Sequence, residues 1–587
     1  MFINTHTNNS VLFLNREALG KQASFKTNYK KAKITLDQTR PSLENLKANF
    51  VTFLGRKEIQ FESFNRSDIT FDNTGGFHSE KAILKNILKT ALSSNRPDET
   101  EHTYLLQGNS GNGKSILIKA LAGEINKNNI PSIRSYGGKY GIDKTRELRG
   151  DYNGDGGERV ANLFWYARNK ARESPSKSAV IFIENIDAML PVRSCQNQGE
   201  ISINASQTLA NFLAELENIK SDKELKIFVV ATSSNSLSID KSAFDQFNNV
   251  INVYIPKNKE ERKEIIQAII KNNNIQLDLA SSDEIIDRIA HCTGGYNPLR
   301  IKNIFNIAQK YAESQDNPIQ LKDALAGFLD ERDGKIKPIS DNIDFIRVSI
   351  AHEIGHALTR YIMSRVANKL ASEHDIKWSE CGLINCINLD PRDGYSASVE
   401  VMYNYNNPFN SYEYNFAEMV SNYASQPCEA LYNLTTNGPK GDIIKSYELA
   451  RKAVKEWGMG KNSGMQIPGI DNPITKWEDA IEEDIDLITS SAITASKKIV
   501  DTYKDFIMMK ASDYALEMQN RAENRNNDTS AYPVPLIITD KEFIEGLKSW
   551  ESTIDSKKIQ TLEQDLIELI LKSRPSHHVQ LKKQLVS

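Results

Sequence analysis

Two short motifs in this chain have the residue types and the spacing to do chemistry. The first, from His352 to His356, reads His-Glu-Ile-Gly-His. Two histidines four residues apart lie on one face of a helix and can share a zinc ion, and Glu353 beside them can deprotonate an attacking water. The alternative is a helix with two buried histidines. The motif predicts the centre of a zinc endopeptidase that degrades protein or peptide substrates.

A catalytic zinc ion also needs a third protein ligand and an open position. Spacing alone leaves this ligand open, because several downstream side chains have suitable atoms: His374, Glu418, Glu429 and Asp442.

The second motif is a glycine-rich loop that matches the pattern GxxxxGK[ST]. Its residues are Gly108, Asn109, Ser110, Gly111, Asn112, Gly113, Lys114 and Ser115. The glycines allow backbone N–H groups to face phosphate oxygens, while Lys114 would reach the β- and γ-phosphates and Ser115 would hold Mg²⁺. The motif predicts a site for ATP with Mg²⁺, and the alternative is an ordinary glycine-rich turn.

The elements around this loop alternate between apolar runs and helical stretches. The expected strands are Tyr104–Leu106, Ala179–Ile183, Ile227–Ala231 and Ile251–Ile255. Such runs between helices are typical of a parallel sheet covered on both faces. They predict an α/β nucleotide-binding domain over residues 67–257, after an unassigned N-terminal region 1–66.

The rest of the chain reads as mainly helical. We expect a helical lid over 258–332, a linker over 333–341, a metallopeptidase domain over 342–550 and a C-terminal helix with a tail over 551–587. A β-like piece at Leu383–Leu389 is interpreted either as an edge to which an extended substrate adds as a strand or as an ordinary structural strand.

At the end of the expected strand Ala179–Ile183 the chain resembles the AAA+ ATPases, and specifically the FtsH-like ATP-dependent zinc proteases. That family reads IFIDEIDA where this chain reads IFIENIDA. The resemblance extends upstream to Ile69–Gly76 and downstream to Thr293–Asn297 in the lid. It also includes Tyr152–Gly156, which matches an aromatic-x-Gly pore loop. Tyr152 is interpreted either as a pore residue or as an ordinary loop tyrosine.

The chain departs from the family at three ATPase positions. Glu184 keeps a metal-binding carboxylate, but Asn185 stands where a carboxylate activates the attacking water, and Ser233 stands where the sensor is usually Asn. The segment that should carry arginine fingers, Phe244–Asn249 with Gln246 at its centre, has no arginine. Losing such a base costs about 10²–10⁴ in rate and losing an arginine finger about 10³–10⁵. We therefore expect ATP binding with impaired hydrolysis, unless Glu184 serves as the base through a one-residue shift of the strand end.

The resemblance also bears on the third zinc ligand. The family's peptidase domain carries a Gly-x-x-x-Asp-Ile segment, and here this is Gly438–Ile443, followed by Leu449–Arg451 and Trp457–Met459. The resemblance thus implies Asp442 as the ligand, with Glu418 and Glu429 as supporting carboxylates, and it implies a hexamer.

Composition adds exclusions. The net charge of −3 gives no case for a nucleic-acid partner. The five scattered cysteines form no CxxC pair and favour reduced thiols, and no apolar run is long enough to span a bilayer. We expect a soluble, cytoplasmic protein.

Two other functions remain as alternatives. One is a fully ATP-driven unfoldase-protease, in a hexamer of identical or mixed subunits. The other is a non-catalytic ATP-binding adaptor, against which the intact His-Glu-Ile-Gly-His motif argues.

Overall fold

The computed structural model describes the chain in thirteen segments: residues 64, 68–93, 101–138, 147–148, 155–192, 200–338, 340, 342–374, 383–393, 395–402, 410–463, 475–525 and 534–575. The expected pore-loop residue Tyr152 and the side chain of His374 lie outside the part of the chain that is described.

The α/β part is built on a five-stranded parallel sheet. Its strands are β1 (Thr103–Gln107), β2 (Ser132–Tyr136), β3 (Ser178–Glu184), β4 (Lys226–Ser233) and β5 (Asn249–Asn252), in the order β2-β3-β4-β1-β5. The expected strand at Ile251–Ile255 lies two to three residues earlier as β5. The edge strand β2 was not expected, because its Ser-Ile-Arg-Ser-Tyr sequence is largely polar and forms no apolar run.

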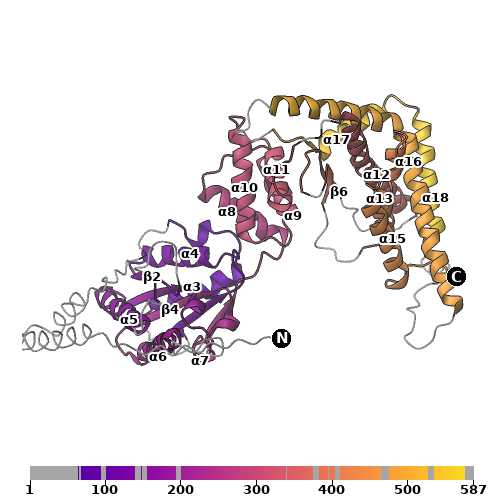
Figure 1. Ribbon diagram of the computed structural model, residues 1–587. Helices are drawn as coiled ribbons and strands as arrows, with labels where there is room; N and C mark the ends of the chain where they lie inside the picture. The colour runs from indigo at the N-terminus through magenta and orange to yellow at the C-terminus, as the bar shows by residue number, and fades with distance from the viewer. Residues whose placement is uncertain are drawn as a thin grey trace, which may run out of the picture.

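Helices cover both faces of this sheet. The longer ones are α3 (His78–Leu92) and α4 (Lys114–Lys127) on one face and α5 (Asp155–Glu173) and α6 (Glu200–Ser221) on the other (Figure 1). The short elements are η1 (Phe71–Asn73), η4 (Ile186–Ala188), η6 (Ser236–Ser238) and α7 (Lys241–Phe244). Alternate residues of β3 enter the two apolar layers, since Phe182 packs with the α4 side and Ile183 with the α5–α6 side.

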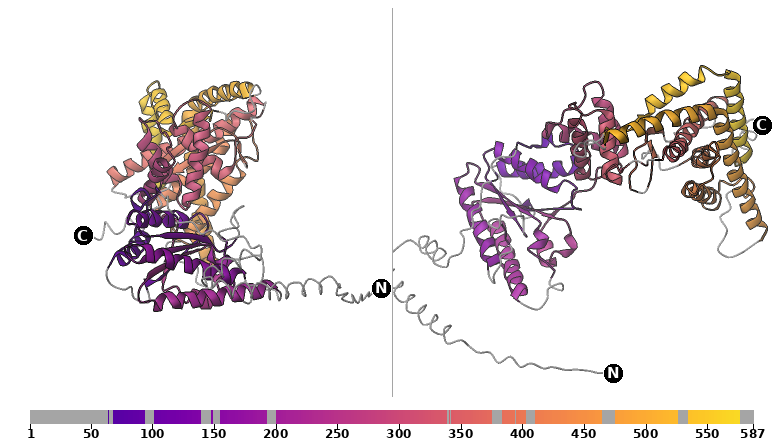
Figure 2. Two further views of the ribbon diagram at one scale, coloured as in Figure 1. Left: turned by 90° about the vertical axis from the view of Figure 1, so that its left-hand side faces the viewer. Right: turned by 45° about the horizontal axis from the view of Figure 1, so that its top comes forward.

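A helical lid follows the sheet. It consists of α8 (Lys259–Asn272), α9 (Ser282–Cys292), α10 (Pro298–Glu313) and α11 (Leu321–Asp333). The side chains of Asn258 and Asn297 cap α8 and α10 by accepting hydrogen bonds from backbone N–H groups. The lid lies between the α/β part and the C-terminal region in Figure 1 and in the right-hand view of Figure 2.

The C-terminal region is mainly helical. Its helices are α12 (Ile343–His374), α13 (Tyr412–Tyr423), α14 (Ser425–Ala430), α15 (Lys440–Lys455), α16 (Thr475–Arg525), α17 (Asp540–Glu551) and α18 (Ser556–Ser573). They share one apolar core, to which α18 contributes Leu566 and Ile570. The sequence had separated residues 551–587 from this domain, whereas α18 packs within it.

A small antiparallel sheet joins this region, with strands β6 (Leu383–Asn388), β7 (Ser398–Met402) and β8 (Ile537–Thr539) in the order β7-β6-β8. The interpretation of Leu383–Leu389 as an edge strand is wrong for its second half, because Cys386–Asn388 pair with β7 on one side and with β8 on the other.

The structure confirms the expected fold class: a five-stranded parallel α/β domain followed by a mainly helical region. Among the described helices, none is long and apolar enough to cross a membrane.

Candidate functional site

Three side chains from two helices converge on one point. His352 and His356 lie one turn apart on α12, and Asp442 lies in the first turn of α15. Asp442 Oδ2 is 3.3 Å from His352 Nε2 and 3.5 Å from His356 Nε2, and the ligand atoms of all three residues lie within 4.8 Å of one another. A tetrahedral zinc ion with bonds of about 2.0–2.1 Å sets its ligand atoms about 3.3 Å apart. The three donors therefore fit a zinc ion in type and in spacing.

The Nδ1 atoms of both histidines, which face away from Asp442, contact oxygen atoms of neighbouring helices. His356 Nδ1 is 2.7 Å from the carbonyl oxygen of Ser421 on α13, and His352 Nδ1 is 3.2 Å from Glu429 Oε1 on α14. The Thr436 hydroxyl donates to the second carboxylate oxygen of Glu429 at 2.8 Å. Such partners orient an imidazole and leave Nε2 available to a metal. Sequence reasoning had no signal for Ser421 or Thr436, because their contacts cross between helices.

The electrostatics of the site favour a cation. Burial by itself would raise the pKa of Asp442, but hydrogen bonds from His352 and His356 outweigh it and hold this pKa well below its usual range. Burial by itself would lower the pKa of His352, yet its hydrogen bonds to Asp442 and Glu429 raise it to about 10. Burial raises the pKa of the Glu353 carboxyl, which suits a group that must take and return a proton.

Gly355 explains how closely α12 approaches α14. A Cβ atom at this position would lie 2.4 Å from Cys428 Sγ and 3.3 Å from the carbonyl oxygen of Ala424. Only a glycine at this position lets α12 approach Ala424 and Cys428 so closely.

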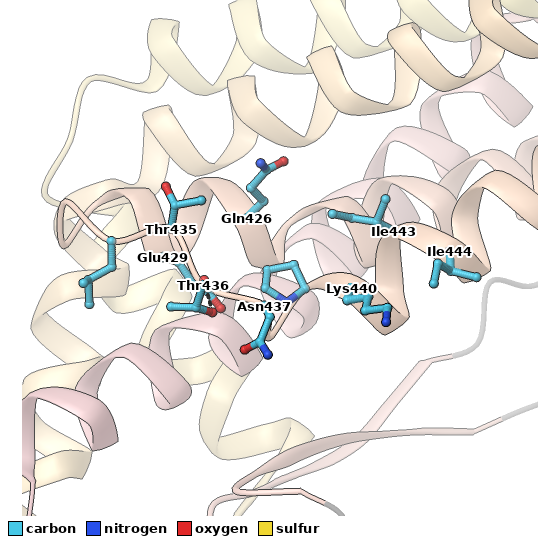
Figure 3. Close-up of a pocket in the computed structure, with 10 residues that line it drawn as sticks. Gln426, Glu429, Thr435, Thr436, Asn437, Lys440, Ile443 and Ile444 are labelled. Atoms are coloured by element: carbon cyan, nitrogen blue, oxygen red, sulfur yellow. Dashed lines mark hydrogen bonds between the residues drawn. The ribbon is translucent and has the colours of Figure 1, made fainter.

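A hollow of about 270 Å³ lies between α14 and α15, and its lining includes Glu429. Figure 3 shows Glu429 and Thr436 on one side of it and Ile443 and Ile444 of α15 on the other. Its lining is mostly apolar at the α15 side, and the two isoleucines are 36% and 46% exposed. It has room for a side chain beside Glu429, the partner of His352.

One other candidate ligand lies elsewhere. Glu418 forms an ion pair of 2.8 Å with Arg360 and is absent from the described group of potential metal ligands.

The phosphate-loop motif lies between β1 and α4, as its pattern predicts. Gly113, directly before the helix, has a φ of 104°, which a residue with a side chain rarely adopts. Lys114 Nζ donates to the carbonyl oxygens of Gly108 at 2.6 Å and of Asn109 at 3.0 Å. Burial lowers the pKa of Lys114, although the nearby Asp187 opposes this shift. The loop, the lysine and the helix N-terminus fit a triphosphate.

Glu184, at the end of β3, is already held on both oxygens. Its Oε2 accepts a hydrogen bond of 2.7 Å from Ser115 Oγ, and its Oε1 accepts one of 2.6 Å from Arg134 Nε on β2. Asn185 is exposed and in the left-handed region at φ 56°. Arg134 is a further residue that sequence reasoning missed, since it lies in the strand that the pattern did not predict.

The two remaining ATPase positions lie within the α/β part. Ser233 is buried at the end of β4, where its Oγ accepts from the Asn235 backbone N–H at 3.1 Å. The Gln246 side chain accepts from Lys220 Nζ at 2.7 Å and is thereby tied to α6.

Comparison with known proteins agrees with this architecture. Residues 104–255 match the family described as ATPase family associated with various cellular activities (AAA). The chain is 23% identical over 410 residues to ATP-dependent zinc metalloprotease FtsH 2 of Salinibacter ruber, covering 68% of this chain and 53% of that one. It is 25% identical over 441 residues to ATP-dependent zinc metalloprotease FtsH of Mycoplasma mobile, covering 72% and 56%.

A third relative matches a shorter part of this chain. The spastin homolog of Caenorhabditis elegans is 29% identical over 240 residues, covering 40% of this chain and 42% of that one. The aligned part spans about half the length of each of these relatives. The chain thus carries an AAA ATPase domain followed by a mainly helical region, and it is distantly related to FtsH proteases and to spastin.

Proposed function

We propose that the chain is a zinc endopeptidase coupled to an AAA ATP-binding domain whose ATP hydrolysis is impaired. The observation that carries the proposal is the convergence of His352, His356 and Asp442, whose ligand atoms lie within 4.8 Å of one another. The proposed units are the α/β domain over 67–257, the lid over 258–332 and a peptidase region from residue 342 that includes α18.

The residues of this site divide the chemistry among them. A zinc ion held by His352, His356 and Asp442 would polarise the scissile carbonyl and acidify the attacking water. Glu353, whose pKa burial raises, takes the proton of that water and returns it to the leaving amine. Glu429 and Ser421 keep the two imidazoles in place.

The nucleotide site supports binding better than turnover. The loop from Gly108 to Ser115 and the helix N-terminus supply a phosphate cradle. Asn185 is an amide that cannot accept a proton, and Gln246 is neutral and tied to Lys220. AAA proteins usually oligomerise, and we propose that ATP supports a hexameric ring here.

The peptidase proposal is tested with Glu353→Gln. We expect wild-type protein to hold about one zinc ion per chain and to cleave casein, and Glu353→Gln to retain zinc while cleavage falls at least about 100-fold. Glu373→Gln, on an exposed position of the same helix, is the matched control and should leave both unchanged. Undiminished cleavage by Glu353→Gln would contradict the role proposed for Glu353, whereas a wild-type protein without zinc and without cleavage would contradict the peptidase proposal and favour an adaptor.

The ATPase proposal is tested separately by measuring ATP binding and turnover on the full chain. We expect binding that is lost in Lys114→Ala, with turnover at least about 100-fold slower than a typical enzyme rate near 10 s⁻¹. Brisk turnover that Lys114→Ala abolishes would instead support the fully ATP-driven alternative.

A further inference from the structure

The carboxylate expected to hold Mg²⁺ already has a cation beside it. Arg134 contacts Glu184 through Nε at 2.6 Å and through a second guanidinium nitrogen, so Oε1 of the carboxylate faces two N–H groups. Oε2 accepts from Ser115, the other residue expected to hold the metal. The Glu184 side chain is only 6% exposed. Charge-assisted contacts of this kind are stronger than neutral ones, and more so when they are buried.

Two aromatic rings also lie close to the guanidinium. Its central carbon lies 4.8 Å from the ring centre of Phe64 and 5.0 Å from that of Tyr136. Phe64 is itself fixed to the strand, since its backbone N–H donates to the carbonyl oxygen of Ser132 at 2.7 Å. Rings in such positions stabilise a cation and restrict its rotamers, so moving Arg134 away from Glu184 carries a cost.

Mg²⁺ requires near-octahedral oxygen ligands and is usually held through one or two carboxylates together with substrate phosphates. Here the Glu184 carboxylate is neutralised by the Arg134 guanidinium. A metal ion would have to displace this guanidinium or bind beside it. We propose that Arg134 supplies the positive charge at this position itself, so that nucleotide binding to the loop does not depend on Mg²⁺. This inference rests on the proposed ATP binding and adds a positioning role for a residue of β2.

The test measures affinity rather than catalysis. A fluorescent ATP analogue is titrated into the full chain with excess Mg²⁺ and with EDTA. We expect the wild-type dissociation constant to change less than about threefold between the two conditions, and that of Arg134→Gln to rise at least about tenfold in EDTA, because the freed Glu184 carboxylate then faces the phosphates without a cation. Arg134→Lys keeps the charge and should change less than Arg134→Gln.

The matched control is Arg168→Gln. Arg168 pairs with Glu215 at 2.5 Å between α5 and α6 and is about as buried as Arg134, but lies on the other face of the sheet. It should bind like wild type in both conditions. A wild-type affinity that falls tenfold or more in EDTA overturns the inference without any variant, even if Arg134→Gln fails to fold. If the wild-type chain binds nucleotide with Mg²⁺ but loses this affinity in EDTA, the proposed ATP binding still holds. If it binds nucleotide in neither condition, both the proposed ATP binding and the inference about Arg134 are wrong.

Discussion

At the scale of single residues, the proposed metal centre depends on one aspartate that the sequence could place only through a family resemblance. The histidines are separated from Asp442 by more than 80 residues, and several other acidic side chains lie between them. In the structure Asp442 Oδ2 lies within 3.5 Å of both histidines, while Glu418 pairs with Arg360. The geometry supports Asp442 as the third ligand.

Asp442→Asn should remove zinc from the site. An amide keeps the shape of the side chain but loses the charge that offsets the metal, so we expect zinc affinity to fall at least about 100-fold and cleavage to be lost. Zinc content by metal analysis after dialysis checks this. Glu448→Gln, exposed on the same helix, should keep its zinc. Full zinc content in Asp442→Asn would show that another residue is the ligand.

At the scale of elements, the position of the two histidines depends on how closely α12 packs on α14. Gly355 lies between them, and the Cys428 side chain occupies the space that a Cβ would need. Because cores lack spare volume, even one methyl group at this position must displace its neighbours.

Gly355→Ala should therefore destabilise the C-terminal region by about 1–3 kcal/mol through overpacking. Gly441→Ala is the matched control, since an added Cβ there meets no atom within 4 Å, and alanine in a helix should be neutral or slightly stabilising. Hydrogen exchange of α12 measures both effects. Equal stability of the two variants would contradict the prediction, because it would mean that α14 shifts at little cost to make room for the added methyl group.

At the scale of the whole molecule, the lid and the C-terminal region are joined by charged contacts. Arg392 near the small sheet pairs with Asp330 of α11 at 3.0 Å, and the Tyr311 hydroxyl donates to the same carboxylate. Both partners of the ion pair are almost fully buried. A second contact joins Arg288 of α9 to Asp540 of α17 at 2.6 Å.

Arg392→Met should strongly weaken this junction. It leaves the Asp330 carboxylate buried without its cation, and breaking a buried pair in this way costs about 3–5 kcal/mol. The double variant Arg392→Met with Asp330→Asn should recover part of the loss, because no unpaired charge remains. Hydrogen exchange of α11 measures the loss of stability in both variants. An equal loss in the single and the double variant would contradict the role of the unpaired charge.

Acid should loosen a further contact between α9 and α17, in which Glu284 pairs with Arg288 and with Lys541. The hydrogen bond from Lys541, helped by Arg288, outweighs burial and holds the pKa of Glu284 below its ordinary value of 4.5. A carboxyl with a lowered folded-state pKa contributes stability that is complete above its unfolded pKa and is lost as the pH falls through the folded value. Exchange of α9 and α17 amides should thus accelerate below about pH 4.5, and this component should vanish in Glu284→Gln.

Features that are local in the sequence could be predicted. The spacing in His-Glu-Ile-Gly-His, the phosphate loop and the apolar runs of the central strands each reflect neighbours within one helix turn or one strand, and the structure has them on those elements. The edge strand β2 and the packing of α18 were not evident from the sequence. A half-polar strand and an amphipathic helix do not indicate which part of the chain packs against them.

Contacts between residues that are distant in the sequence were decided only by the tertiary structure. Arg134 and Glu184 are 50 positions apart, and His352 and Glu429 are 77 positions apart. No periodicity relates such pairs, since their meeting depends on strand order and helix packing across the whole chain. The sequence alone thus determined which chemical groups are present, and the fold determined which of them meet.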